Sequence, residues 1–449
     1  MSQTAPIKDE TRAQEPVGAI ARRAREAARA LARLSAERRN AVLVAAADAI
    51  EAARVQILEA NAVDHRAAEP SVAAGKMTSA MFKRLRVTEA AIGEMAMRVR
   101  EVARLADPLG RTLMATELDD HLTLFRESCP LGVVGVVFES RPEVVPQLAS
   151  LALKSGNAII LKGGSEAAHT NEALVTVWRV ALEKFSEVPA DSVQLLQTRA
   201  DVLELLKLDR DVDLIIPRGS YELVRYITEH SRIPVLGHGD GICHVYVDRD
   251  ADMEKAVEIA CDAKVQYPAV CNAAETLLVH EEIAGKYLPL IAERLKKAGV
   301  EIRGDAKTMT LLPQEGIVRA TEQDWSTEYG DLILSIKVVP GIDEAIDHIN
   351  RYGSRHTDAI VTEDDAAAAK FMNEVDSAGV FQNASTRFSD GFRYGFGAEV
   401  GISTSKLHAR GPMGLEGLTT YKYKLYGNGH TVGPYSTGQK KFKHKPLNS

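Results

Sequence analysis

Cys271 is the side chain of this sequence best placed to act as a nucleophile. It lies in the segment QYPAVCNAAETLLVH, residues 266 to 280, between the turn formers Tyr267-Pro268 and a run of β-formers at 276 to 279. An irregular backbone can present a thiol to a substrate while an adjoining strand holds it still. A cysteine is also often a small buried hydrophobic residue, so both roles stay open at this point. As a nucleophile, Cys271 needs donors for a thiolate and an oxyanion, and we expect the backbone N–H groups at Cys271 and Asn272 to supply them.

Two further turns, each directly after an apolar run, suit the binding of phosphate groups. AIILK, residues 158 to 162, and DLIIP, residues 213 to 217, predict strands, and open α/β sheets bind ligands at the carboxyl ends of their strands. A Gly-Ser turn that opens a helix also offers free N–H groups to an anion. The sequence has no GxGxxG fingerprint and no P-loop, and ordinary strand-to-helix turns have the same composition. The residues of these two turns are Lys162, Gly163, Gly164, Ser165, Arg218, Gly219 and Ser220.

A third group of candidates is cationic. The string FGAEVGISTSKLHARGPMGLEGLTT, residues 396 to 420, carries Lys406, His408 and Arg410 among five glycines that prevent a long helix. Such a loop suits a substrate that bears a carboxylate and a phosphate. Arg141, beside Pro142, is a further candidate for the same anionic groups. A solvated basic loop has the same composition, so that alternative is kept.

Composition places the chain among globular proteins. Its 449 residues carry a net charge of -7, with 45% hydrophobic and 26% charged residues and no apolar run long enough to span a bilayer. We therefore expect no nucleic-acid partner and no membrane association. The four cysteines show no CxxC spacing, so we expect no metal site, no disulfide framework, and a cytoplasmic location. Residues 1–16 predict a disordered leader, and residues 431–449 predict a solvated basic tail.

The elements that must position these residues predict an α/β fold of two domains. Apolar residues three and four apart between residues 42 and 58 predict a helix that Ser35 caps. Apolar runs joined by helical stretches predict a first parallel sheet. The glycine-rich GHGDG, residues 237 to 241, predicts the boundary to a second series of strands. The predicted strands are 131–138, 158–162, 192–197 and 213–217, then 243–248, 275–280, 332–339, 358–362 and 379–384.

Two segments fit neither domain. HLTLFRESCPLG, residues 121 to 132, and LTTYKYKLYG, residues 418 to 427, alternate in part between apolar and polar residues. They predict either the strands of a protruding arm or two edge strands of the main domains.

The segment around Cys271, with Asn272-Ala273-Ala274-Glu275-Thr276, resembles the catalytic-cysteine segment of the aldehyde dehydrogenase superfamily. The string at 396 to 420 resembles the signature of one branch of it, the gamma-glutamyl phosphate reductases. This resemblance implies two doubly wound α/β domains plus a small β arm for oligomerisation. The implied division is an NADP-binding domain of residues 17–119 and 134–242, a catalytic domain of 243–412, and an arm of 120–133 and 413–430.

The resemblance also implies roles for single residues. Lys162 would contact the adenosine ribose or its phosphate, and Ser165 stands where many NAD-using relatives carry a carboxylate, which favours NADP(H) as the cofactor. Gly219-Ser220 would lie near the cofactor phosphates, and Glu328 would hold the nicotinamide ribose. Ser140, in FESRP, falls near the position of an oxyanion-hole asparagine in relatives.

A missing glutamate favours reduction over oxidation. Oxidising relatives activate water with a glutamate in an ELGG-like motif, and the matching stretch here, VLGHGDG at 235 to 241, has none. An acyl-enzyme would then persist long enough to accept hydride. The implied function is NADPH-dependent reduction of L-glutamyl 5-phosphate through a Cys271 thioester, in proline biosynthesis, by a homo-oligomer associated in function with a glutamate 5-kinase. The alternatives are an oxidising aldehyde dehydrogenase with His238 or Asp240 as the base, and a non-catalytic protein on the same scaffold.

Overall fold

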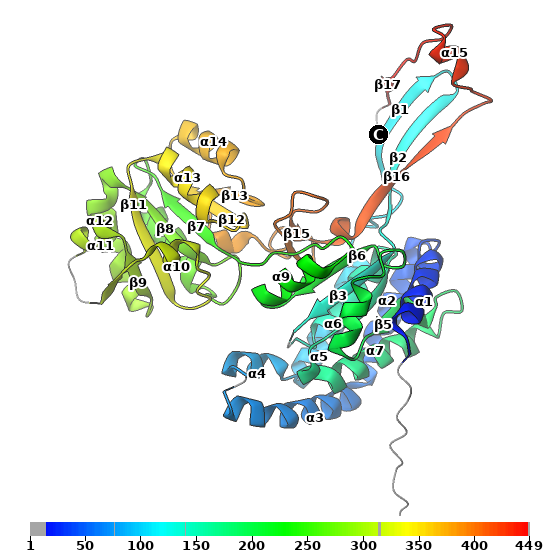
Figure 1. The fold of residues 1–449 in the computed structure, drawn as a ribbon, viewed down its shortest axis with the longest axis horizontal. Helices are drawn as coiled ribbons and strands as arrows, with labels where there is room; N and C mark the ends of the chain where they lie inside the picture. The colour runs from blue at the N-terminus through cyan, green and yellow to red at the C-terminus, as the bar shows by residue number, and fades with distance from the viewer. Residues whose placement is uncertain (1–14, 76, 140, 313–315, 448–449) are drawn as a thin grey trace, which may run out of the picture.

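A computed structural model describes residues 15–75, 77–139, 141–312 and 316–447. The described part forms two lobes with an arm that projects away from both (Figure 1). Most of the expected leader, residues 1–14, and the predicted site residue Ser140 lie outside the described residues. In this part of the chain, no helix combines the length and the apolar character needed to cross a membrane.

The first lobe begins with a layer of helices. The side chain of Ser35 accepts a hydrogen bond from the Arg38 N–H and caps the second helix, which confirms the predicted cap. The predicted apolar face is buried there, with Leu43 and Ile50 at 0% exposure. The helices of this layer are α1 (Val17–Leu31), α2 (Ala36–Ala52), α3 (Arg54–Ala73), α4 (Ser79–Leu85) and α5 (Glu89–Arg104).

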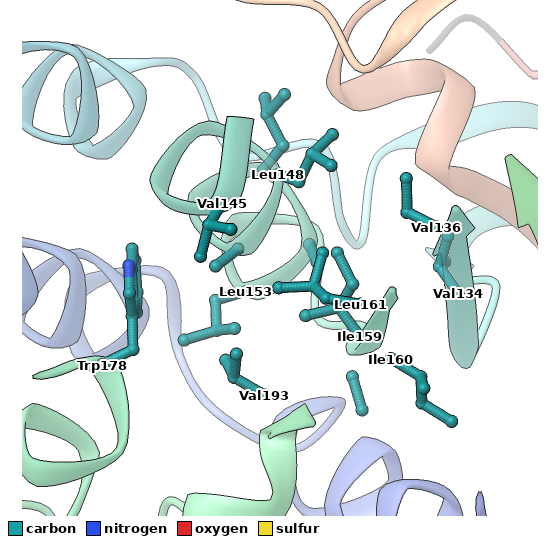
Figure 2. Close-up of a cluster of buried hydrophobic side chains, with 14 of the residues drawn as sticks. Val134, Val136, Val145, Leu148, Leu153, Ile159, Ile160, Leu161, Trp178 and Val193 are labelled. Atoms are coloured by element: carbon teal, nitrogen blue, oxygen red, sulfur yellow. The ribbon is translucent and has the colours of Figure 1, made fainter. Parts of the chain in front are cut away.

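A parallel four-stranded sheet in the order β5-β4-β3-β6 forms the centre of the first lobe. Its apolar runs pack against helices, as Figure 2 shows for Val134, Leu161 and Trp178. The predicted strands are present as β3 (Val133–Phe138), β4 (Ala158–Lys162), β5 (Val193–Leu195) and β6 (Leu214–Arg218). The connecting helices are α6 (Val144–Lys154), η1 (Ser165–Ala167), α7 (Ala168–Leu182), η2 (Ala190–Ser192), α8 (Arg199–Leu205) and α9 (Tyr221–His230).

The second lobe holds a parallel seven-stranded sheet in the order β10-β9-β11-β8-β7-β12-β13. Five strands were predicted, whereas β9 (Glu301–Gly304) and β10 (Ile317–Arg319) are too short to give a clear apolar run. The predicted strands are β7 (Cys243–Val247), β8 (Ala274–His280), β11 (Ile333–Val339), β12 (Thr357–Val361) and β13 (Gly379–Gln382). The helices are α10 (Met253–Val265), α11 (Glu281–Lys297), α12 (Ala306–Leu311), η3 (Glu322–Ser326), α13 (Ile342–Tyr352), α14 (Asp365–Glu374) and η4 (Thr386–Phe388).

The arm is an antiparallel sheet in the order β16-β2-β1-β17. The two predicted segments form β2 (Leu122–Pro130) and β16 (Thr419–Tyr426), which pair directly, so the arm rather than the edge-strand alternative is present. The boundaries differ from the prediction, because β1 (Thr112–Asp119) turns back through His121 at φ 61° and joins the arm. The predicted tail also returns to the arm through α15 (Gly433–Ser436) and β17 (Lys445–Pro446).

A second boundary differs from the prediction of a catalytic domain that extends to residue 412. The segment with β14 (Gly401–Ser403), β15 (Gly411–Met413) and η5 (Leu415–Leu418) packs on the first lobe. Ala398, Val400, Met413 and Leu418 are buried in the hydrophobic core of that lobe. The chain therefore returns from the second lobe to the first before it enters the arm, and the two lobes are joined by two connections.

Candidate active site

A cavity of about 750 Å³ is lined by both lobes. Cys271 and Glu328 reach it from the second lobe, and Arg141 and Arg218 reach it from the first. Sequence reasoning placed all four in the site, and the structure brings them to one cavity.

Cys271 lies in the loop between α10 and β8, as the sequence predicted, and is half-buried. The Ala273 N–H donates to the Val270 carbonyl at 2.9 Å, which closes a turn with Cys271 at its centre. Gly241 packs directly against this turn, since a Cβ atom there would lie 2.2 Å from the Cys271 carbonyl oxygen and 2.5 Å from its Cβ. Gly241, in the predicted domain boundary, is thus required for Cys271 to lie where it does.

Asn272 anchors the turn that carries Cys271. Its side-chain Nδ2 donates to the Ser389 carbonyl at 2.8 Å, and Thr386 Oγ1 donates to the Asn272 carbonyl at 2.7 Å. The Asn272 side chain is 4% exposed, so it holds the turn rather than facing substrate. The predicted role of the Asn272 backbone in an oxyanion site stays a prediction.

Two imidazoles lie beside the thiol. One ligand atom each of His238, Cys271 and His356 falls within 4.8 Å of the others. His238 Nδ1 donates to the Ile402 carbonyl at 2.8 Å, and His356 Nδ1 lies 2.9 Å from Thr357 Oγ1. The Nε2 atom of His356 is buried and has no hydrogen-bond partner among the described residues. Sequence reasoning considered His238 and missed His356, because the two histidines are far apart in the chain.

Three arginines, Arg141, Arg218 and Arg387, line the cavity together with Cys271. Arg387 follows β13, is 7% exposed, and donates from Nε to Gln266 Oε1 at 2.9 Å. Burial lowers the pKa of the Arg387 guanidinium group, and the positive charge of Arg393 lowers it further. Burial likewise lowers the pKa of Arg218, and the positive charge of Arg141 lowers it further. Cys271 lines the same cavity as both guanidinium groups. Arg387 had no signal in the sequence, because it is a single cation in a loop.

Two buried carboxyl groups, those of Glu143 and Glu399, act on Arg218. Burial raises the pKa of Glu143, which Arg141 opposes, and burial likewise raises the pKa of Glu399. Glu399 Oε2 accepts a hydrogen bond from the Gly391 N–H at 2.8 Å, and its carboxyl acts on the pKa of Arg218. Glu399 lines the cavity together with three further acids, Glu139, Glu328 and Asp390, so cations and acids are mixed along its wall.

The carboxyl edge of the first sheet places Lys162 and Arg218 on either side of β3, in register with Val137 and Phe138. Lys162 Nζ donates to the Gly163 carbonyl at 2.5 Å, and burial lowers the pKa of this lysine. Ser165 is exposed beside it. Gly163 and Gly164 leave no room for a Cβ, which would lie 2.1 Å from Asn171 Nδ2 and 2.0 Å from Glu166 Oε1. A cation, a tight turn and an exposed hydroxyl fit the ribose end of a dinucleotide phosphate.

The N-terminus of α9 already holds an anionic group. Ser220 caps the helix by accepting from the Leu223 N–H, and the Ser220 N–H donates to Glu139 Oε2 at 2.9 Å. A Cβ at Gly219 would lie 2.3 Å from the same carboxylate oxygen. The carboxylate of Glu139 thus stands where the sequence predicted a cofactor phosphate, which supports an anion site and means that a phosphate would replace Glu139 there.

Glu328 is exposed at the opposite side of the cavity. It faces Asp240, whose pKa is raised by burial and then by the Glu328 charge. Behind Glu328, Glu275 Oε1 accepts from the Gly330 N–H at 3.3 Å and Glu275 Oε2 pairs with Lys264 Nζ at 2.5 Å. This buried ion pair connects the nucleophile loop to the Glu328 loop and was not predicted.

The structure does not bring Lys406, His408 and Arg410 to the Cys271 cavity. Lys406 and Arg410 form ion pairs with Asp376 at 2.7 and 3.0 Å, and His408 Nε2 donates to the Gly417 carbonyl at 2.9 Å. His408 and Arg410 line a different cavity, of about 800 Å³, near the base of the arm. A sequence shows cations in a loop but not the remote carboxylate that pairs with two of them. Lys406 and Arg410 form a contact between the lobes through Asp376, whereas His408 binds a carbonyl of its own segment.

Comparisons with known proteins agree with this arrangement. A family model described as the aldehyde dehydrogenase family matches residues 3–311. The gamma-glutamyl phosphate reductase of Synechococcus sp. strain JA-3-3Ab is 53% identical over 441 residues, which cover 98% of this chain and 96% of that protein. The protein of the same name from Natronomonas pharaonis is 55% identical over 412 residues, which cover 92% and 93%. The crystal structure of gamma-glutamyl phosphate reductase from Thermotoga maritima matches with a TM-score of 0.90 and 43% identity, covering 93% of this chain and 100% of that one.

Proposed function

The chain belongs to the aldehyde dehydrogenase family and is an oxidoreductase, and on that premise we propose that it reduces L-glutamyl 5-phosphate to L-glutamate 5-semialdehyde and phosphate. The observation that carries the proposal is the half-buried thiol of Cys271 in a cavity flanked by Arg387, Arg218 and Arg141. A substrate with a carboxylate at one end and an acyl phosphate at the other would pair with these guanidinium groups. The names of the relatives point to the same substrate and to proline biosynthesis.

Cys271 would attack the acyl carbon, form a thioester and release phosphate. The thiol proton would pass to an imidazole nitrogen of His238 or His356 and then to the departing phosphate, so that the step is balanced. The turn closed by Ala273 and Val270 would hold Cys271 in position for the attack. A free carboxylate offers a thiolate no good leaving group, whereas an acyl phosphate does.

The cofactor would be NADPH, held by Lys162 and Ser165 at its adenosine end and by Glu328 at its nicotinamide ribose. Bound there, NADPH supplies a hydride for the thioester carbon. Ser165 brings no carboxylate of its own to Lys162, on which Glu166 already acts, and its hydroxyl suits a 2'-phosphate better than an acid there would. Arg218, Gly219 and Ser220 would hold the pyrophosphate at the α9 N-terminus once Glu139 is displaced.

Assembly into a homo-oligomer would occur through the arm. Its outer strand, β16, exposes Tyr423, Leu425 and Tyr426 at 57–58%. An edge strand with exposed apolar side chains is suited to pairing with a second copy. A functional association with a glutamate 5-kinase would deliver the labile acyl phosphate.

The reverse reaction gives the direct test. Glutamate 5-semialdehyde and NADP⁺ are mixed with the protein, with and without phosphate, and NADPH is followed by its absorbance. We expect phosphate-dependent turnover that is lost in Cys271→Ala and kept in Cys129→Ala, which removes another half-buried thiol, in the arm. Turnover without phosphate would instead indicate a hydrolytic aldehyde dehydrogenase with Asp240 or His238 as its base. An active Cys271→Ala variant would show that another group is the nucleophile.

A further inference from the structure

The group formed by His238, Cys271 and His356 has a chemistry that acyl transfer alone does not explain. One thiol and two imidazoles meet with their ligand atoms within 4.8 Å of one another. Sulfur and imidazole nitrogen form the donor set of zinc sites, whereas Mg²⁺ and Ca²⁺ prefer oxygen. Ligand atoms of a tetrahedral zinc site lie about 3.5 Å apart, so the group needs to close by about 1 Å.

The two imidazoles are oriented to present free nitrogens. His238 Nδ1 donates its proton to the Ile402 carbonyl at 2.8 Å, which leaves Nε2 without a proton. Such a hydrogen bond from the second ring nitrogen to a carbonyl is the usual support of a metal-binding histidine. His356 is 0% exposed, and its Nε2 has no partner among the described residues although it is buried. An unpartnered buried nitrogen is unfavourable unless something binds it.

The three ligands are mounted on separate, well-supported parts of the chain. His356 directly precedes β12, Cys271 lies in the turn that Asn272 anchors, and His238 comes from the connection between the lobes. The rings of His238 and His356 lie edge to face with centroids 5.0 Å apart. His238 and Cys271 line the cavity while His356 lies buried behind them, and His238 is bound to Ile402 of the segment that packs on the first lobe, so the arrangement depends on the two lobes being together.

We propose that His238, Cys271 and His356 form a reversible inhibitory site for a borderline-soft divalent cation such as Zn²⁺. On binding, the Cys271 thiol releases its proton to solvent and a Zn–S bond forms, with no change of oxidation state. The sulfur lone pair is then no longer available to attack an acyl carbon. The inhibition, though not the binding, rests on the proposed role of Cys271 as nucleophile.

The test follows alkylation of Cys271 by iodoacetamide, read peptide by peptide by mass spectrometry, with Zn²⁺ or Mg²⁺ present. We expect Zn²⁺ to slow labelling of Cys271 about tenfold or more, EDTA to restore it, and Mg²⁺ to have no effect. Cys129, the half-buried thiol of the arm, serves as the internal control and should label at an unchanged rate. This measurement requires no turnover, so it separates failure of the metal site from failure of the proposed reaction.

Variants identify the ligands. His238→Gln and His356→Gln should each raise the Zn²⁺ concentration needed for protection by at least about tenfold. His230→Gln removes an exposed imidazole at the end of α9 and should leave the Zn²⁺ concentration needed for protection unchanged. Co²⁺ should give a thiolate charge-transfer band in the wild type that is absent in Cys271→Ser, which covers the case that the buried His356→Gln variant does not fold. Protection that survives both histidine variants, or no protection and no Co²⁺ band in the wild type, would overturn the proposal.

Discussion

The buried ion pair of Lys264 and Glu275 joins the two ends of the loop that carries Cys271. Lys264 lies in the last turn of α10 and Glu275 near the start of β8, so their contact at 2.5 Å closes the loop that carries Cys271. Both side chains are 0% exposed. Glu275 also accepts from the Gly330 N–H, two residues after Glu328. One pair thus positions both the thiol and the carboxylate expected to hold the cofactor.

Removal of one partner should destabilise the second lobe strongly. Lys264→Met leaves the Glu275 carboxylate buried without its cation, and breaking a buried pair in this way costs about 3 to 5 kcal/mol. In a lobe of this size, that corresponds to a fall in Tm of roughly 10 to 20 °C. The pKa of Glu275 is raised and that of Lys264 is lowered by burial, so loss of hydration outweighs the attraction between them. Replacing both residues with apolar ones, as in Lys264→Met with Glu275→Leu, should therefore recover most of the lost stability.

Calorimetry of the single and double variants checks this reasoning, with Lys297→Met as the control. That variant breaks the Lys297–Glu293 pair of the same lobe, whose side chains are 72% and 66% exposed, and its Tm should be unchanged. The double variant should still show a raised KM for NADPH, because the Gly330 N–H has lost its acceptor. A Tm of Lys264→Met within a degree or two of the wild type, or a double variant less stable than either single one, would refute the argument.

Three further outcomes follow from individual contacts. Gly241→Ala should abolish activity, since its Cβ would lie 2.2 Å from the Cys271 carbonyl oxygen. Gly285→Ala, with open space around it in α11, should be fully active. Steady-state rates of the two variants and the wild type check this prediction. Ser165→Asp should raise the KM for NADPH by at least about tenfold relative to NADH, because a carboxylate would repel the 2'-phosphate. Burial raises the pKa of Glu275 from 4.5 to about 7, so between these values the folded chain binds more protons than the unfolded chain and wild-type stability falls as pH rises. The stability deficit of Glu275→Gln should therefore shrink from pH 4.5 to pH 7 in denaturant titrations, and a constant deficit would contradict it.

The sequence predicted the sheets well because buried parallel strands are continuous apolar runs. AIILK became β4 with the predicted bounds, and the turns after β4 and β6 lie at the carboxyl edge where the argument placed them. The errors lie where long-range packing decides. The segment from 396 to 418 packs on the first lobe, and strand β1 joins the arm, although neither outcome has a local signal.

The site was predictable to the same extent. Cys271 was found because its flanking turn and strand are local features of the sequence. Arg387 and His356 were missed because only the fold brings them to the thiol, from loops beyond residue 350. Lys406 and Arg410 were misplaced for the opposite reason, since Asp376 pairs with both across the lobes. Local chemistry therefore pointed to Cys271, whose role as nucleophile stays a prediction, while the groups that lie around it required the tertiary structure.

The charges of the cavity support the proposal of an anionic substrate. The positive charge of Arg141 lowers the pKa of Arg218, and the positive charge of Arg393 lowers the pKa of Arg387. Burial raises the pKa of two acids that act on Arg218, Glu143 and Glu399, while Glu139, Glu328 and Asp390 also line the cavity. Arg141 and Arg218 therefore repel each other in the cavity, and an anionic group bound beside them would relieve that repulsion.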